Sequence, residues 1–183
     1  MELAHNTFHK VLVRTAVVIT TISARGIANA APFSFNSPIS FEPPLYGFSC
    51  NPAHDTWRNI RANGEFVVNV VGKELGERLH VLETDYPYEE CELTHAGLTE
   101  ARASTVKPPR IKEALAWLEC TCEHAVELGD HIWITGRVVA AAVKDEYWKA
   151  PGVLDLEKAN PLCHLSGDLF VTDLKEARYK RAP

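Results

Sequence analysis

The amino-acid sequence predicts a mainly β fold, an antiparallel barrel with a few helices outside it. Segments rich in Val, Ile, Phe and Trp, which favour strands, outnumber the segments with helical periodicity. Most of these segments come in pairs separated by short turns, which is the pattern of antiparallel hairpins rather than of parallel βαβ units. Closing such a sheet into a barrel removes its exposed edges.

A first hairpin is expected near the N-terminus. Residues 10–22 are expected to form one strand, because Val and Ile dominate the second half of this segment. Residues 24–26 supply the turn, in which Gly26 can take a positive φ. Residues 27–33 then return as the second strand of the hairpin.

A helix is expected after the next strand. Four prolines in residues 32–44 exclude a regular helix there, and residues 45–50 form a short aromatic strand. Asn51 or Asp55 can cap the following helix, whose apolar residues fall on one face. Gly64 is the natural end of this helix, because glycine adopts the left-handed C-cap conformation without strain.

The middle of the chain has a weaker pattern. Residues 65–71 are expected to form a strand, and residues 73–82 a short helix with its leucines on one side. Residues 83–110 show no regular period, and segments of this length without one are usually functional or mobile.

A second, longer hairpin is expected in the last third of the chain. Residues 116–128 and 131–143 both favour strands, and Gly129-Asp130 lies between them as a two-residue turn. Residues 169–171 are expected to close the sheet.

Composition places the chain among ordinary folded proteins. Its 183 residues, 46% of them hydrophobic, predict a single domain over residues 1–183. The net charge of −5 gives no sign of a nucleic-acid or acidic-membrane partner, and the basic cluster at residues 175–181 is expected to be a solvated tail or helix end. Polar residues interrupt the only stretch that resembles a signal peptide, and no apolar run reaches the length of a membrane span, so a cytoplasmic protein is expected.

The five cysteines do not form a recognisable framework. Their odd number argues against a disulfide scaffold, and the spacing of Cys120 and Cys122 does not match a typical zinc or iron site. Buried thiols are therefore favoured over a redox pair, and no metal site is expected. The sequence also lacks the glycine-rich motifs of dinucleotide and P-loop folds, the G-x-S-x-G elbow and H-E-x-x-H. We therefore expect no side chain to carry catalysis by itself.

Two segments carry candidate binding residues. Residues 29–36 combine small residues and a proline with short polar side chains, which lets the backbone approach a flat ligand. Taken alone, they favour a hairpin that leaves the sheet through a proline loop. Residues 49–56 lead from a strand into a helix N-terminus, where N–H groups and the helix dipole favour an anion such as phosphate. A plain polar cap is the alternative there.

Together, these two segments resemble the flavin-binding half of the flavin-reductase-like, FMN-binding split-barrel family. Further matches in the same order are Gly64 to Asn69, Pro108 to Arg110, Leu118 to Cys120, Leu128 to His131 and Gly136 to Val138. The resemblance implies a Greek-key-type split barrel with peripheral helices. It also implies a homodimer with FMN near the subunit interface.

Carried over residue by residue, the resemblance implies a set of cofactor contacts. Beside the flavin ring and ribityl chain it places Asn29, Ala30, Ser34, Phe35 and Asn36, with Thr20 and Thr21 nearby. Around the phosphate it places Ser49, Asn51, His54 and Thr56. Many relatives carry Lys or Arg where this chain has His54, so phosphate binding here could depend on pH.

The resemblance also implies a redox function. A hydride from NADH or NADPH would pass to the flavin, with His131 as a possible nicotinamide or flavin contact. Independently of the resemblance, Tyr86 and Tyr88 in the aperiodic residues 83–110 suggest a mobile cover over the flavin. Residues 164–167 depart from the sequence pattern of the reductase branch. How a nicotinamide nucleotide would bind is therefore left open. The alternatives are a flavoredoxin-like electron carrier that uses no nicotinamide, or a flavin- or haem-binding module without turnover.

Overall fold

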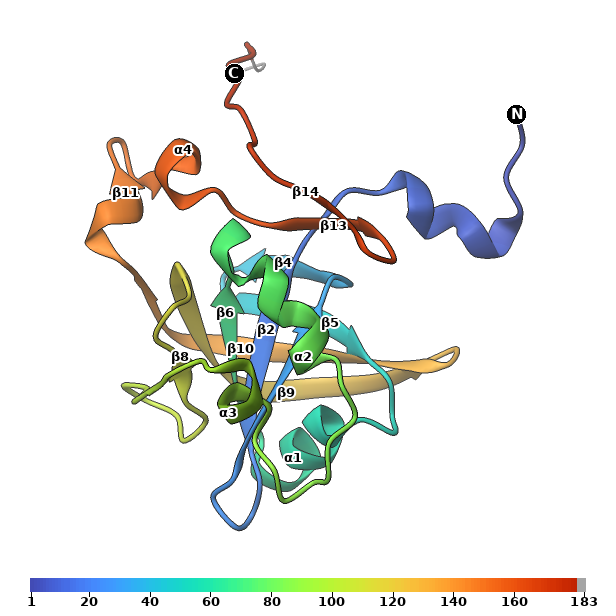
Figure 1. Cartoon of the computed structure of the whole chain (residues 1–183), viewed down its shortest axis with the longest axis vertical. Helices are drawn as coiled ribbons and strands as arrows, with labels where there is room; N and C mark the ends of the chain where they lie inside the picture. Colours follow the sequence, from blue (N-terminus) through green and yellow to red (C-terminus); the bar gives the residue numbers. More distant parts are fainter. Residues whose placement is uncertain (181–183) are drawn as a thin grey trace.

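Seven antiparallel strands form the main sheet of the computed structural model, which describes residues 1–180 (Figure 1). The strands are β2 (Val17–Ile22), β3 (Ala28–Phe33), β4 (Asn36–Phe41), β5 (Pro44–Cys50), β6 (Glu65–Val70), β9 (Ala116–Leu128) and β10 (His131–Val143). They lie in the order β3-β2-β6-β9-β10-β5-β4, so β3 and β4 are the edges. This architecture confirms the expected mainly β fold with helices outside the sheet.

Smaller sheets flank the main one. A three-stranded sheet joins β1 (Arg14–Thr15), β13 (Cys163–Ser166) and β14 (Leu169–Val171). Two short pairs join β7 (Glu100–Ala101) to β8 (Arg110–Ile111), and β11 (Trp148–Lys149) to β12 (Val153–Leu154). The expectation that residues 169–171 close the main sheet was therefore wrong, because β14 pairs with β13 instead.

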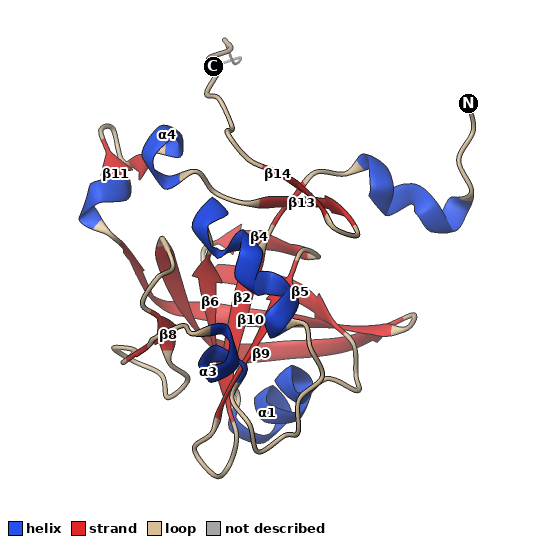
Figure 2. Ribbon diagram, in the orientation of Figure 1, coloured by secondary structure: helices blue, strands red, loops and turns tan. Residues whose placement is uncertain are grey.

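The helices are short and lie outside the sheet (Figure 2). The 3₁₀ helices are η1 (His5–Val11), η2 (Lys73–Arg78) and η3 (Asp145–Tyr147), and the α-helices are α1 (Asp55–Asn63), α2 (Leu79–Leu82), α3 (Glu92–Ala96) and α4 (Leu156–Ala159). Among residues 1–180, no helix combines the length and apolar character that crossing a bilayer requires. Residues 175–180 are exposed and lie in neither helix nor strand, as a tail would, whereas Arg181 of the basic cluster lies outside the described residues.

The first expected strand is divided into three parts. Residues 5–11 form η1, and β1 pairs with β13 rather than with the main sheet. Ala16 is buried and its N–H donates to Leu162 O, and only from Val17 does the chain pair with β3 and β6. The switch between two sheets explains why a single run of strand-forming residues does not make a single strand.

An unexpected strand, β4, lies in the proline-rich segment. Pro38 sits within it opposite Tyr46 of β5. Because β4 is an edge strand, the missing N–H of Pro38 can face away from the neighbouring strand, and proline is tolerated there.

Helix α1 ends where the sequence predicts but has a different N-cap residue. His54 is the N-cap residue, without a side-chain capping bond, so neither Asn51 nor Asp55 caps it. Asn51 instead shapes the turn before the helix, since its Oδ1 accepts a 2.9 Å hydrogen bond from Ala53 N–H. Gly64 ends the helix in the left-handed conformation at φ 70° and donates to Ile60 O, as predicted.

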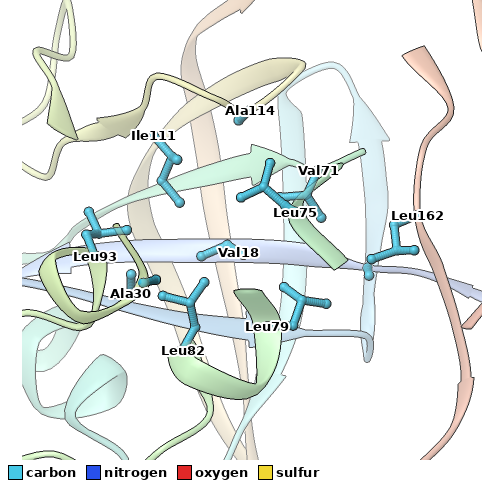
Figure 3. Packing of buried hydrophobic residues seen from close by; sticks show 12 residues of the cluster. Val18, Ala30, Val71, Leu75, Leu79, Leu82, Leu93, Ile111, Ala114 and Leu162 are labelled. Carbon is cyan, nitrogen blue, oxygen red and sulfur yellow. The ribbon is translucent and has the colours of Figure 1, made fainter. Parts of the chain in front are cut away.

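Two of the three hydrophobic clusters among the described residues share β2. Val17 and Ile19 face a cluster between the strands, which includes Phe48 and Phe66. Val18 faces the opposite side, where Leu75, Leu79 and Leu82 of η2 and α2 pack with Leu93 of α3 (Figure 3). The predicted apolar face of residues 73–82 is thereby confirmed. These two clusters hold α2 and α3 against β2 and β3, and thus position the candidate site.

The long hairpin and the cysteines follow the sequence expectations. His131 pairs with Leu128 across a two-residue turn in which Gly129 has φ 64°. All five cysteines are free thiols, of which Cys50, Cys120 and Cys163 are buried. Burial raises the pKa of Cys120 to about 12, so this thiol is a core residue rather than a nucleophile.

Candidate functional site

A cavity of about 370 Å³ lies between β3, the N-terminus of α1 and the segment that follows α2. Of the predicted site residues, Asn29, His54 and Thr56 line it. Ala31 and Pro32 of β3 form an apolar wall, and Tyr86 lies on the side of the segment after α2. Its volume lies within the range of pockets that hold small molecules.

The N-terminus of α1 offers two free donors to this cavity. No hydrogen bond among the described residues uses the backbone N–H groups of Asp55 and Thr56, and both residues line the cavity. His54 precedes them and is exposed, whereas the Thr56 hydroxyl donates to Asn29 Oδ1 over 3.1 Å. Free N–H groups at a helix N-terminus are a preferred site for an anion such as phosphate.

A chain of buried hydrogen bonds runs behind the cavity. Tyr88 donates to Asn59 Oδ1 over 2.6 Å, and Asn59 Nδ2 donates to Thr21 Oγ1 over 3.0 Å. Thr21 then donates to Asn29 Oδ1 over 3.2 Å, and Asn29 Nδ2 donates to Glu92 Oε1 over 2.7 Å. The predicted residues Thr21 and Asn29 therefore belong to one network that links α1, β2, β3 and α3.

Glu92 is a site residue that the sequence did not reveal. Its carboxylate also accepts a 2.9 Å hydrogen bond from the N–H of Ala30, and the residue is only 8% exposed. Burial raises its pKa, against the hydrogen bonds from Ala30 and Asn29 that lower it. The segment that carries Glu92 has no periodic pattern, so nothing in the sequence distinguished this carboxylate from its solvated neighbours.

The structure does not bring Thr20 to the cavity. Its hydroxyl donates to Pro109 O over 2.5 Å and accepts from Asn69 Nδ2 over 3.1 Å. Asn69 Oδ1 accepts in turn from the N–H of Ile111 over 2.7 Å. Thr20 thus faces the opposite side of β2 from Thr21 and holds the loop before β8.

The remaining predicted residues lie outside the cavity. Ala30 is buried, and Asn51 is half-buried in the turn before α1. A second group lies around β4 and the end of β10 and consists of Ser34, Phe35, Asn36, Ser49 and His131. The residues that the sequence places around one cofactor therefore form two separate groups in this chain.

Phe35 is the centre of the second group. Its ring centroid lies 6.4 Å from that of His131, and the Arg14 guanidinium lies 5.2 Å from the same ring. Nδ1 of His131 lies 2.7 Å from Asp130 Oδ1, so the aspartate orients this imidazole at the turn. The Ser34 hydroxyl lies 3.0 Å from Nδ1 of His164.

Asn36 and Ser49 fix the backbone beside Phe35. Asn36 Nδ2 donates to Thr15 O over 2.9 Å, and Tyr46 donates to Asn36 Oδ1 over 2.5 Å. The N–H of Ser49 donates to Phe35 O over 2.8 Å. These contacts hold an exposed aromatic ring at a defined place on the edge of the sheet.

Side-chain contacts hold the segment after α2 over the cavity. The Arg58 guanidinium lies 3.5 Å from the centroid of Tyr88, and Tyr86 stacks on His95 at 4.0 Å. Arg25 of the β2–β3 turn pairs with Glu89 at 3.7 Å. The segment therefore covers one side of the cavity, while its predicted mobility stays a prediction.

Comparisons with known proteins identify the family. The model of the flavin reductase like domain matches residues 9–165. An uncharacterized protein of Halalkalibacterium halodurans is 37% identical over 171 residues, which cover 87% of this chain and 81% of that protein. A Shewanella frigidimarina protein assigned as a flavin reductase with a split barrel domain superposes with a TM-score of 0.88 at 24% identity, over 98% of this chain and 94% of that one.

An FMN-binding protein from Thermus thermophilus superposes with a TM-score of 0.78 at 19% identity, over 98% of this chain and 97% of the other. At this identity the likeness shows the shared fold. The family match covers most of the chain. This chain therefore belongs to the flavin reductase like domain family and has its split-barrel fold.

Proposed function

We propose that this protein is a flavoprotein oxidoreductase that holds FMN in the cavity beside α1 and receives electrons from NADH or NADPH. One observation carries the proposal: Asp55 and Thr56, whose N–H groups have no hydrogen-bond partner among the described residues, line a cavity of about 370 Å³ in a chain of the flavin reductase like family. A single helix terminus, without a glycine-rich pyrophosphate loop, suits a mononucleotide better than FAD.

The residues around the cavity fit a phosphate-bearing flavin in their geometry. The N-terminus of α1 would hold the phosphate, with the Thr56 hydroxyl and His54 beside it. The wall of Ala31 and Pro32 would support the flat ring system, and the fastened segment at Tyr86 would exclude water. Bound FMN supplies hydride-accepting chemistry that no protein side chain offers. The protein contributes binding, orientation and the exclusion of solvent.

We also propose a homodimer, because the chain exposes many large apolar side chains. They include Phe8 and Val11 of η1, Ile39 and Phe41 of β4, and Leu169 of β14. Exposed apolar side chains of this size favour an interaction site, and β4 is also an open sheet edge. A second copy would cover some of these side chains and bring residues to Phe35 and His131, which could then contact the flavin or the nicotinamide of the partner.

The test is an anaerobic titration. Purified protein is mixed with FMN and then with NADH or NADPH, and flavin bleaching is followed by absorbance. Bleaching with either nucleotide, faster than for free FMN, is the expected result. Bound FMN that neither nucleotide reduces would instead identify an electron carrier or a flavin-binding module. Failure to bind flavin would overturn the proposal.

A further inference from the structure

The cavity beside α1 is lined by carboxylates rather than by permanent cations. Asp55 stands at the N-terminus of α1, Glu83 and Asp85 follow α2, and Glu92 belongs to α3. No Lys or Arg lines the cavity among the described residues, and His54 is its only imidazole. A phosphate dianion at the helix terminus therefore meets attraction from the N–H groups and repulsion from four carboxylates.

Glu92 is the least solvated of these carboxylates. Its two oxygens accept from Asn29 Nδ2 and from the N–H of Ala30, and no ion pair among the described residues neutralises it. Burial raises its pKa, and the nearby charge of Asp55 acts in the same direction. A further negative charge in the cavity would favour the protonated form of Glu92 still more.

The charges around the cavity do not cancel the effects that raise the pKa of Glu92. Arg58 lies 3.8 Å from Asp55, but its guanidinium also covers the ring of Tyr88. Burial raises the pKa of Asp55, and the charges of Asp85 and Glu89 add to that effect, against Arg58 and His54. The other charged or titratable groups on the elements around Glu92 are Arg25, Arg78, His80, Glu90, Cys91 and His95.

We propose that these carboxylates couple phosphate binding in the cavity to proton uptake, with Glu92 as the principal proton acceptor. The inference rests on the proposed function, since it concerns the same FMN site. The equilibrium is protein plus FMN dianion plus one proton, giving the complex with one carboxyl protonated. A phosphate site built from cations prefers the dianion and loses affinity as the pH falls, whereas this site gains affinity.

The test compares FMN with riboflavin, which lacks the phosphate. Dissociation constants are measured at pH 6 and pH 8 by fluorescence titration for the wild type, Glu92→Gln, Asp85→Asn and His54→Lys. We expect the wild type to bind FMN about tenfold more tightly at pH 6 than at pH 8, with riboflavin changing less than about twofold. The pH dependence of FMN binding should persist in His54→Lys, which removes the imidazole.

The carboxylate variants test which side chains cause the pH dependence of FMN binding. Glu92→Gln and Asp85→Asn should each tighten FMN binding at pH 8 by roughly three- to tenfold and leave riboflavin binding unchanged. Asp85 is exposed, so its variant tests the charge even if Glu92→Gln folds poorly. Glu89→Gln is the matched control, because Glu89 lies on the same segment but does not line the cavity.

Two outcomes would overturn the inference. One is FMN affinity in the wild type that is no higher at pH 6 than at pH 8, and the other is unchanged FMN affinity at pH 8 in both carboxylate variants. Riboflavin binding in either case would leave the proposed function standing. A protein that binds neither flavin would contradict both.

Discussion

Nε of Arg110 donates a 2.8 Å hydrogen bond to Oε1 of Glu119, whose side chain is completely buried. The same carboxylate accepts from the N–H of Ser104 over 2.7 Å and of Thr105 over 2.6 Å. Glu119 belongs to β9 and the other three residues to the loop before and at β8. One buried carboxylate therefore holds a loop that has almost no secondary structure of its own.

Glu119→Gln should destabilise the protein in a pH-dependent way. Burial alone would raise the pKa of Glu119, but the hydrogen bonds from Ser104, Thr105 and Arg110 outweigh it and hold the pKa at about 2. Because the folded pKa lies below the ordinary value of 4.5, the stabilisation is present above pH 4.5 and is lost as the pH falls toward 2. It amounts to about 3 kcal/mol at neutral pH.

Urea unfolding of the wild type and of Glu119→Gln at pH 7 and pH 3 measures this difference. The difference in unfolding free energy between the wild type and Glu119→Gln should be larger at pH 7 than at pH 3. Glu127→Gln, an exposed position on the same strand, is the control and should change the stability by less than about 0.5 kcal/mol. Equal stability of wild type and Glu119→Gln at pH 7 would show that the carboxylate does not hold the loop.

Tyr88→Phe should loosen the segment that covers the cavity. The substitution removes the donor to Asn59, a residue that is 1% exposed, and leaves a buried oxygen without that partner. The expected cost is about 1–3 kcal/mol, felt mainly as faster hydrogen exchange in residues 83–91. Tyr86→Phe is the control, since no hydrogen bond of the Tyr86 hydroxyl exists within residues 1–180. Unchanged exchange in Tyr88→Phe would mean that the stacking with Arg58 suffices.

The sequence predicted the sheet well because its signals are local. The β9–β10 hairpin and the C-cap at Gly64 depend on residues close in the chain. The sheet switch at Ala16 was not predictable, because the partner of β1 lies almost 150 residues later. Strand β4 was missed because Pro38 excludes a central strand but not an edge strand.

The sequence predicted only those parts of the candidate site that are formed by residues close to one another in the chain. Asn29, His54 and Thr56 line one cavity, as the two motifs implied together. Glu92 lies 63 residues after Asn29, whose side chain donates a hydrogen bond to it. It belongs to a segment with no periodic pattern. The contribution that we propose for a second copy near Phe35 and His131 would be equally invisible in one chain.

Gly136→Ala should destabilise the barrel interior. A Cβ at this position would lie 2.4 Å from Cζ of Phe66 and 3.0 Å from Cβ of Cys120. Both neighbours belong to the packed core, so the expected loss is about 1–3 kcal/mol of unfolding free energy. Thermal unfolding measures it, with Gly76→Ala as the control, because the nearest atom there is 3.7 Å away. Recovery of stability in Gly136→Ala/Phe66→Leu would confirm the steric cause.

Phe41→Asp should convert a dimer into a monomer without unfolding it. Phe41 is 96% exposed on the edge strand β4, so its side chain contributes little to the stability of a single chain. In a dimer that buries this side chain, an aspartate would be desolvated without a partner. Light scattering should give twice the chain mass for the wild type and for Tyr179→Asp, an exposed position in the C-terminal tail. A monomeric wild type that still binds flavin would contradict the proposed dimer.

His54→Ala should weaken FMN binding while leaving the melting temperature of the apo protein almost unchanged. His54 is the N-cap of α1, but its side chain makes no capping bond and is exposed, so its removal costs little stability. The imidazole nevertheless lines the cavity at the helix terminus, where we place the phosphate. A hydrogen bond to a charged group is worth about 1.5–3 kcal/mol, which corresponds to a roughly 10- to 150-fold increase in the dissociation constant.

Parallel titrations with FMN and riboflavin separate a phosphate contact from a ring contact. His54→Ala should weaken FMN at both pH 6 and pH 8 and leave riboflavin unchanged, because riboflavin has no phosphate to lose. His54→Lys should preserve FMN affinity, since a permanent cation replaces the imidazole beside four carboxylates. Asn51→Ala provides the contrast: its side chain accepts from Ala53 N–H and does not line the cavity, so it should lower the melting temperature rather than the affinity. FMN affinity that is the same in His54→Ala and the wild type would place the phosphate away from α1.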